Sequence, residues 1–290
     1  MTTAALPALQ VTTRTKAPIL RLLRAELRFM FRRPRTLAAL GLVAVVPIVA
    51  GIGVSLASSA PQGGGPDQAI AGIAAIVKGN GLILPVFVLL LSMTMLLPLL
   101  GTMWSADAIA GEASAGGLRN LLLAPVGRAR LLAVKAFGIA VFCLLAVVIM
   151  AVVAAIAGMA ILGGGQMLTL SGSTLGFGAS IGRIALLVAL VTIQIWAIAA
   201  IALAISTLTD HPLIVLSVTL GGVILFTVLA AIPSLDWLHP VLLTTGFPDL
   251  ADVVRDPMPT DAITDGILRA ACYILIGYSI ALGRMATRDG

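Results

Sequence analysis

Charged residues are scarce in this sequence. Only 10% of its 290 residues are charged, 60% are hydrophobic, and the mean hydropathy is +1.12. A soluble domain typically carries about 25% charged residues and 45–50% apolar residues. The composition therefore excludes an ordinary soluble domain and indicates an integral membrane protein.

Residues that carry catalytic chemistry are equally scarce. The two cysteines, Cys143 and Cys272, lie within apolar runs, and His211 and His239 are each followed by proline. This spacing matches neither a disulfide framework nor a metal site. The phosphate-binding motif G-x-x-x-x-G-K-[ST] is also absent. We therefore expect no catalytic residue, metal ion or cofactor in this chain, and no enzymatic activity of its own.

Several apolar runs reach the length of about 20 residues that is needed to cross a bilayer as a helix. Six such runs are predicted, at roughly 36–57, 82–104, 131–162, 183–207, 213–232 and 263–285. Because nothing apolar precedes Thr36, we expect the first run to serve as the insertion signal in place of a cleaved leader. The predicted fold class is an all-α membrane protein with six transmembrane helices.

The basic residues are distributed unevenly over the predicted connections. Of the 18 lysines and arginines, 14 lie on one side: eight in the N-terminal segment, four in 111–135 and two in the tail. The positive-inside rule places that side in the cytoplasm. We therefore expect a multi-pass protein of the cell membrane with both termini cytoplasmic, and a net charge of +6 that reflects topology and not nucleic-acid binding.

These patterns divide the chain into three parts. The predicted domains are a cytoplasmic N-terminal segment (1–35), a single six-helix transmembrane domain (36–285) and a cytoplasmic tail (286–290). Between the fifth and sixth spans, an apolar external connection is too short to cross the bilayer. For this connection we predict a pair of short helices, broken at Pro240 and Pro248.

The N-terminal segment is predicted to contain an amphipathic helix between Pro18 and Arg33. Apolar residues cover much of this helix. Four arginines fall on one stripe along it: Arg21, Arg24, Arg28 and Arg32. Such a helix lies in the membrane interface, with its guanidinium groups among lipid phosphates. This helix either only anchors the first span, or it also acts as a lever that contacts a cytoplasmic partner.

The predicted spans contain almost no ionisable groups near their middle. Ion-driven carriers generally need an acid or a histidine at this depth to bind the coupling ion. The polar residues at this depth are hydroxyls and amides such as Thr94, Gln194 and Ser217. A transporter of this composition would take its energy from a separate ATPase subunit.

The most polar segment between two spans is "GEASAGGLRNLLLAPVGRARLLAVK", residues 111–135. A helix that continues past Trp104 would be interrupted at Gly116–Gly117, and a short leucine-rich helix would follow up to Pro125. Such a helix pair either docks into a groove of a cytoplasmic partner or forms a solvated hairpin.

This segment resembles the connection between the second and third spans of ABC type-2 export permeases. The matching positions include a glutamate, a leucine-rich turn, a Pro-Val-x-Arg sequence and a lysine at the start of the third span: Glu112, Gly117, Leu118, Leu122, Pro125, Val126, Arg128, Leu131, Leu132 and Lys135. The chain departs from the family pattern at Gly116, where a charged residue is more usual, and at Val134, where the family has glycine.

The resemblance implies a permease subunit of an ATP-driven exporter. The 107–130 segment would couple it to a separate ATP-binding subunit, which would carry ATP and magnesium. The residues implied in this coupling are Glu112, Leu118, Arg119, Leu121, Leu122, Pro125 and Arg128. A second permease copy would complete a path for an amphipathic or hydrophobic cargo, such as a drug, an antibiotic or a lipid-like molecule. Path-lining candidates are Met93, Thr94, Ser217 and Thr219.

Two alternatives of other classes remain open. One is an ion-coupled secondary carrier, which would transport without any ATPase. The other is a non-transporting membrane anchor or assembly factor, whose ATPase partner would bind without responding to cargo.

Overall fold

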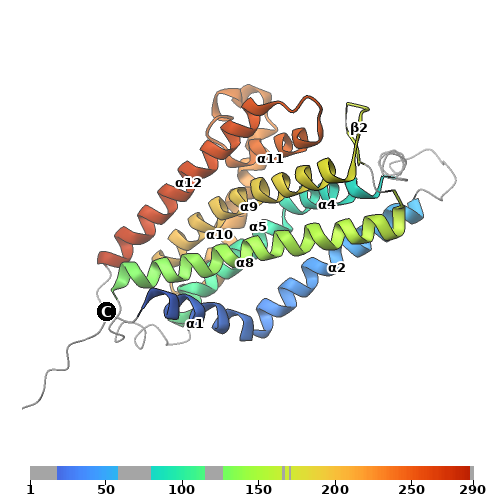
Figure 1. The fold of residues 1–290 in the computed structure, drawn as a ribbon. Coiled ribbons are helices and arrows are strands. Elements are labelled where there is room, and N and C mark those ends of the chain that lie inside the picture. The colour runs from blue at the N-terminus through green and yellow to red at the C-terminus, as the bar shows by residue number, and fades with distance from the viewer. Residues whose placement is uncertain (1–17, 58–79, 115–126, 165–166, 170, 288–290) are drawn as a thin grey trace, which may run out of the picture.

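The computed structural model describes residues 18–57, 80–114, 127–164, 167–169 and 171–287. The described chain is almost entirely helical (Figure 1). The longer helices are α1 (Ile19–Arg32), α2 (Pro34–Ala57), α4 (Leu84–Met93), α5 (Leu96–Ala108), α8 (Arg128–Ala157), α9 (Phe177–Leu208), α10 (Pro212–Ala230) and α12 (Thr260–Thr287). The short elements are η1 (Gly81–Ile83), α6 (Ala110–Ser114), η2 (Gly158–Leu162), β1 (Met167–Leu168), β2 (Thr174–Leu175), η3 (Pro233–Leu238), η4 (Leu243–Thr245), α11 (Gly246–Asp249) and η5 (Leu250–Val254).

The long helices confirm the all-α membrane fold. In the described part of the chain, five helices are long and apolar enough to span a membrane: α2, α8 with η2, α9, α10 and α12. A sixth candidate span consists of η1 and α4 together with α5, which meet at a bend of 56°. All six segments lie where the apolar runs predict them, but the second is bent, whereas its sequence predicts one continuous helix.

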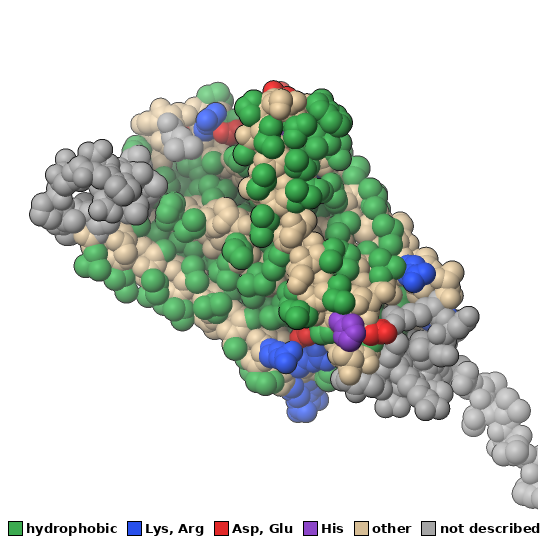
Figure 2. Space-filling model, turned by 180° about the vertical axis from the view of Figure 1, so that it is seen from behind, with side chains coloured by type: hydrophobic (Ala, Val, Ile, Leu, Met, Phe, Trp, Pro, Cys, Tyr) green, Lys and Arg blue, Asp and Glu red, His purple; other side chains and the backbone are tan. Residues whose placement is uncertain are grey.

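The helices form an elongated bundle with two chemically different ends (Figure 1). We call one the basic end; there α1, α6, the start of α8 and the end of α12 come together. We call the other the acidic end; it holds η3, η4, α11, η5 and the short β1–β2 hairpin. Between the two ends, hydrophobic side chains cover most of the surface in Figure 2, and charged side chains gather toward the ends.

Helix α9 lies at the centre of the bundle and packs against α5, α8 and α12. Its contact with α12 is very close, because a Cβ atom on Gly277 would lie 2.6 Å from the backbone of Ala200. The core around it includes Phe142 and Trp104, whose ring centroids are 5.8 Å apart. By contrast, α10 exposes several large apolar side chains, such as Leu213 at 72%. Exposed apolar surface of this kind is stable against lipid or another apolar surface, but not in water.

The acidic end contains the short helices that the sequence predicts between the fifth and sixth spans. The chain leaves helical conformation around Pro240, as predicted. The predicted break at Pro248 is wrong, because Pro248 lies inside α11. Proline is tolerated in the first turn of a helix, where its missing N–H would have no partner within the helix in any case.

Arginine side chains hold this segment against the spans. Arg269 on α12 donates from Nη1 to the Leu242 carbonyl at 3.1 Å. Arg183 on α9 donates to the Val253 carbonyl, also at 3.1 Å. Both bonds satisfy backbone carbonyls of the connection between α10 and α12, so they hold this connection against the spans.

Candidate functional site

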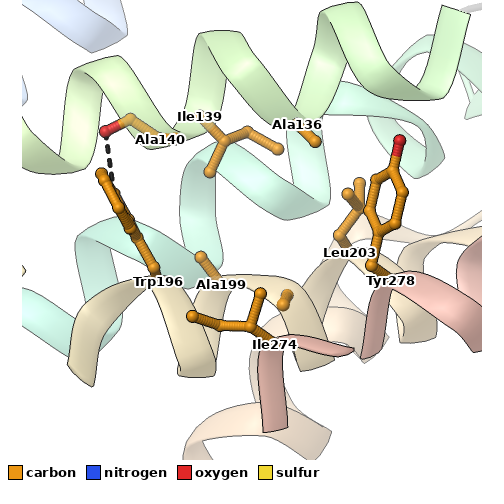
Figure 3. Close-up of a pocket in the computed structure, with 9 residues that line it drawn as sticks. Ala136, Ile139, Ala140, Trp196, Ala199, Leu203, Ile274 and Tyr278 are labelled. Atoms are coloured by element: carbon orange, nitrogen blue, oxygen red, sulfur yellow. Dashed lines mark hydrogen bonds between the residues drawn. The ribbon is translucent and has the colours of Figure 1, made fainter. Parts of the chain in front are cut away.

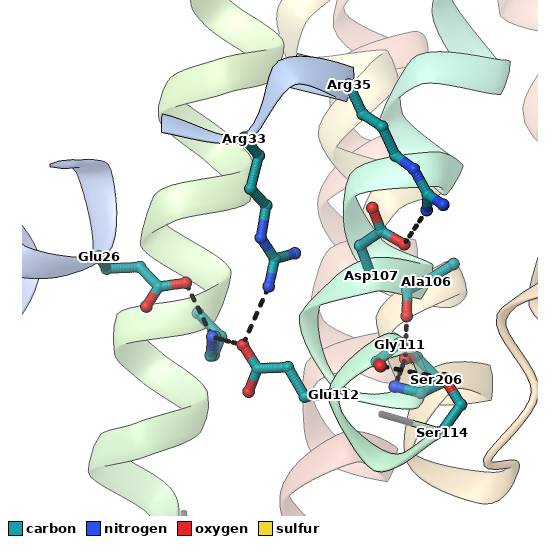
Figure 4. A network of polar contacts seen from close by, with 11 residues as sticks. Glu26, Arg33, Arg35, Ala106, Asp107, Gly111, Glu112, Ser114 and Ser206 are labelled. Carbon is teal, nitrogen blue, oxygen red and sulfur yellow. Dashed lines mark hydrogen bonds and ion pairs between the residues drawn. The ribbon is translucent and has the colours of Figure 1, made fainter. Parts of the chain in front are cut away.

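The candidate site lies at the basic end, where the second span gives way to α6. Helix α5 ends at Ala108, and the chain turns at Ile109 before α6 begins. Ser206 of α9 is inserted into this turn: its Oγ accepts a hydrogen bond from the Ala110 N–H at 3.0 Å and donates to the Ala106 carbonyl at 3.4 Å (Figure 4). These two backbone groups would pair with each other in a continuous helix. The Ser206 hydroxyl therefore takes the place of this helical bond and stabilises the break.

The break directs Glu112 toward α8, where it meets a buried lysine. The Lys135 ammonium lies 2.5 Å from Glu112 Oε1 and 2.9 Å from Glu26 Oε1. Arg33, at the end of α1, lies 3.6 Å from the same Glu112 oxygen (Figure 4). The Lys135 side chain is only 5% exposed and that of Glu112 only 11%. Two acids and two bases thus form a neutral cluster, which we call the charge cluster: Glu26, Arg33, Glu112 and Lys135.

Helix α1 packs closely on α8 beside the charge cluster. A Cβ atom on Gly138 would lie 3.0 Å from the sulfur of Met30 and 3.2 Å from Cγ of Glu26. One turn further, the rings of Phe31 and Phe142 are 4.7 Å apart. The small residue on α8 lets α1 approach closely enough for Glu26 to reach Lys135.

A second, more exposed contact joins the start of α2 to the end of α5. Arg35 lies 3.9 Å from Asp107 (Figure 4), but its side chain is 79% exposed. Exposed ion pairs contribute little to stability, typically about 0–1 kcal/mol. The buried charge cluster therefore contributes more to holding the basic end together than the Arg35–Asp107 pair does.

Beside α6 the surface is hollowed. An open hollow of about 480 Å³ is lined by the turn from α1 to α2, by Asp107, by Gly111 and Ser114 of α6, and by Pro212 at the start of α10. Its walls are polar and charged on one side and belong to four different helices. A group bound in this hollow would contact Arg33 of the charge cluster and α6, the helix that carries Glu112.

The described part of the chain holds two of the predicted coupling residues. Glu112 is in the charge cluster, and Arg128 at the start of α8 donates to the carbonyls of Met285 and Ala286 at 3.4 and 3.2 Å. Arg128 thereby caps the C-terminal end of α12. The other five lie in 115–126, outside the described residues: Leu118, Arg119, Leu121, Leu122 and Pro125.

The predicted arginine stripe of α1 is exposed along its whole length, at Arg21, Arg24, Arg28 and Arg32. Sequence reasoning did not single out Glu26, Arg33 or Ser206. For Glu26 a signal existed, because an acid among the basic residues of an amphipathic helix needs a partner if the helix packs on its neighbours.

The path-lining candidates divide into two groups. Met93 is fully buried in the core, and Thr219 is 5% exposed with a hydroxyl that has no hydrogen-bond partner within the described residues. Thr94 and Ser217 are exposed on the bundle surface. The structure thus leaves Thr94 and Ser217 accessible to a molecule outside the bundle and encloses the other two.

A half-open apolar pocket lies between α8, α9 and α12 (Figure 3). Its volume is about 150 Å³, and its walls include Ile139, Leu203 and Ile274. The Trp196 indole closes one side by donating to the Ala140 carbonyl at 3.0 Å. No charged side chain lines this cavity, so it is suited only to an apolar group.

A family model described as "ABC-2 family transporter protein" matches residues 20–263, from α1 to the start of α12. No curated protein matches the chain. The matched region contains the charge cluster, the bent second span and the segment that includes α6.

Proposed function

The chain belongs to the ABC-2 family of transporter proteins, and we propose that it is the membrane permease of an ATP-driven exporter. It is a multi-pass membrane protein, and the matched region is a permease domain, the transmembrane part of such a transporter. Permeases of this family generally pair with ATP-binding subunits. In this proposal ATP and magnesium bind to that separate subunit, and this chain supplies the path.

The observation that carries the proposal is the charge cluster. Lys135 of α8 is paired with Glu112 beside α5 and with Glu26 of α1. Separating any of these partners would leave a charge buried without compensation, which is strongly unfavourable. A displacement imposed on α6 would therefore be passed to α1 and α8 together. This is the property required of a connection between an ATPase and the spans.

The distribution of charge supports a cytoplasmic location for the basic end. The arginine stripe of α1 is suited to the anionic inner leaflet of the cell membrane. Both termini then lie in the cytoplasm, on the side where an ATPase would find ATP. The hollow beside α6 opens on the same side.

The 107–130 segment is the part that would dock on the ATPase. Its leucine-rich stretch, 118–123, provides an apolar anchor, and the hollow beside α6 provides room for a side chain of the partner. Arg128 connects the far end of this segment to α12. The segment would thus be connected at both ends to spans that must move during transport.

A second copy of the permease would complete the path. Helices α2 and α10 expose large apolar side chains along their outer faces, for example Val49 at 61% and Val228 at 53%. Two copies that shield such faces would enclose a largely apolar space with few polar groups. An amphipathic or hydrophobic cargo fits such a path, whether it is a drug, an antibiotic or a lipid-like molecule.

The two alternatives make different predictions. An ion-coupled carrier needs a titratable group that is free to bind its ion, whereas the deeply buried Lys135 is already paired with two carboxylates. A non-transporting anchor would bind the ATPase without moving cargo. Neither alternative explains why α6, α1 and α8 share one buried charge cluster.

The test is transport in inverted membrane vesicles that contain the permease and its ATPase. We expect ATP to drive the uptake of an amphipathic fluorescent cargo, and a Walker-lysine variant of the ATPase to abolish that uptake. Uptake that depends on a proton or sodium gradient but not on ATP would establish the carrier. If ATPase binding is intact and a broad panel of amphipathic cargoes shows no ATP-driven uptake, the exporter proposal is refuted.

A further inference from the structure

The apolar pocket between α8, α9 and α12 owes its space to small side chains (Figure 3). Four alanines lie in its walls: Ala136, Ala140, Ala199 and Ala200. Their side chains end at Cβ, and together with larger neighbours they leave about 150 Å³ that no described atom fills. Helix α12 cannot move closer to α9 to fill this space, because the two backbones already meet at Gly277 and Ala200. The pocket is therefore a stable feature of the fold.

The pocket opens on the outside of the bundle. Its floor is formed by buried side chains: Ile139, Ala199 and Leu203. Its two ends, at Trp196 and Tyr278, are partly exposed (Figure 3). Exposed apolar side chains cover the neighbouring outer faces of α8 and α12, for example Phe137 and Leu275. Because both helices are candidate spans, the pocket opens toward hydrocarbon.

The walls of the pocket suit an apolar occupant and not water. No charged side chain lines it, and the Trp196 N–H is already bonded to the Ala140 carbonyl. A buried water needs about two to four polar partners, whereas an apolar cavity of about 150 Å³ stays dry and takes up a group the size of benzene. An empty pocket is also unfavourable, because the atoms that line it lose dispersion contacts. In a bilayer, the apolar groups that reach its mouth are the acyl chains of lipids.

A charged group lies beyond the pocket at the basic end. Arg128 at the start of α8 reaches across to α12, where its Nη1 donates to the carbonyls of Met285 and Ala286. A guanidinium group has five N–H donors, so it can bind a phosphate in addition to these carbonyls. Ala136 follows Arg128 by about 12 Å along α8, at 1.5 Å per residue. A phospholipid carries its phosphate and its acyl chains in this same order along the membrane normal.

We propose that the apolar pocket binds one acyl chain of an anionic phospholipid from the leaflet at the basic end, with the lipid phosphate at Arg128. The surplus of arginines at this end favours an anionic headgroup over a zwitterionic one. The bound chain fills the space between α8, α9 and α12 and fixes the spacing of these helices. This lipid is a resident of the fold and not the transported cargo. Its binding requires neither an ATPase nor a particular orientation of the bundle.

Trp196 can report on the occupant, because its ring forms part of the pocket wall. Trp104→Phe and Trp237→Phe leave it as the only tryptophan of the chain. This full-length background protein, purified in detergent and stripped of lipid, is titrated with phosphatidylglycerol that carries bromine atoms on its acyl chains. Bromine quenches tryptophan fluorescence on contact. Ala136→Leu fills the pocket, and Ala133→Leu on the exposed face of α8, about one turn earlier, is the matched control.

We expect the quenching to saturate in the background protein and in Ala133→Leu, with half-saturation at a lipid fraction about ten-fold lower than in Ala136→Leu. A ten-fold difference in affinity corresponds to the burial of about two methylene groups. Brominated phosphatidylcholine should require a higher lipid fraction than phosphatidylglycerol. Quenching that rises linearly and equally in all three proteins would overturn the proposal, since Trp196 would then contact only the micelle. Equal half-saturation by the two lipids would refute the preference for an anionic headgroup.

Thermal unfolding of chains that keep all three tryptophans tests the same site without the fluorescence background. A ligand that binds only the folded state stabilises it. Phosphatidylglycerol should therefore raise the melting temperature of the wild type and of Ala133→Leu by several degrees, and that of Ala136→Leu by much less. An equal rise in all three would contradict binding in the pocket.

Other occupants give different results in the same experiments. Saturable quenching by brominated dodecane but by neither lipid would assign the pocket to an apolar cargo. A loss of dimers in Ala136→Leu without any change in the response to lipid would assign it to a contact between two copies. Either result would overturn the proposal, and neither would change the test of ATP-driven uptake.

Discussion

The ammonium group of Lys135 lies 2.5 Å from Glu112 and 2.9 Å from Glu26, so one buried side chain connects three helices. Glu26 belongs to α1, Glu112 to α6 and Lys135 to α8. These residues are separated by 23 positions or more along the chain. The Lys135 side chain thus joins α1, the end of the second span and the third span at a single point.

Replacing this lysine tests the charge cluster. Lys135→Met would leave two buried carboxylates without their shared partner, and we expect it to lower the free energy of unfolding by about 3–5 kcal/mol. Thermal unfolding in detergent measures the loss. Arg35→Met is the matched control, because Arg35 is exposed and its pair should contribute about 1 kcal/mol or less. Adding Glu26→Gln and Glu112→Gln to Lys135→Met should restore part of the stability, and no restoration would contradict a pairing role.

The close contact between α9 and α12 gives a second prediction. Gly277→Ala would place a methyl group against the Ala200 backbone, and we expect overpacking to cost about 1–3 kcal/mol. Gly283→Ala on the same helix meets nothing within 4 Å and should be neutral or stabilising. Thermal unfolding of both variants under the same conditions compares them. An equal effect of the two substitutions would mean that α12 does not pack on α9 at Gly277.

The acidic end should respond to pH through Asp249. Burial raises the pKa of Asp249 above its ordinary value of 3.8. The negative charge of Asp252 raises this pKa further, the positive charge of Arg269 lowers it, and the negative charge of Asp265 raises it. The folded protein then holds this proton more tightly than the unfolded chain. The resulting stability is complete below the ordinary pKa and is lost as the pH rises through the folded pKa.

We therefore expect Asp249→Asn to raise the melting temperature at neutral pH, since it removes the cost of the half-buried charge. The gain should disappear as the pH falls to about 3, where the aspartate is protonated in both states. Melting curves of the two proteins across this range give the answer. A destabilised Asp249→Asn at neutral pH would show that the carboxylate makes a favourable interaction.

The orientation of the bundle can be checked with two cysteines. Ser234→Cys lies in η3 at the acidic end, and Arg28→Cys lies on the arginine stripe of α1 at the basic end. In a background without the two native cysteines, we expect an impermeant thiol reagent to label Ser234→Cys in intact cells. Arg28→Cys should be labelled only after the membrane is opened. The reverse pattern would place the basic end outside the cell.

The spans and the interface helix could be predicted because apolar length and the arginine stripe are local properties of the sequence. Pairings such as Lys135 with Glu26 could not, since they depend on how α1 packs on α8 through Gly138. The break at Thr94 had a local signal in Pro98, but proline in a membrane helix is often accommodated without a sharp bend. At Pro248 the sequence predicts a break that the structure does not have, because a proline in the first turn of a helix is compatible with that helix.

The central claim is that the 107–130 segment couples the permease to an ATPase, and Leu122→Asp tests it most directly. A charge at an apolar anchor typically costs about 2 kcal/mol or more at an interface. We expect co-purification of the ATPase and ATP-driven uptake to fall together while membrane abundance stays near that of the wild type. Glu112→Ala should show a milder loss of co-purification and uptake, together with lower stability, because Lys135 then keeps only Glu26 as its buried partner. Normal co-purification and normal uptake in Leu122→Asp would contradict the account and make the segment a solvated hairpin between two spans.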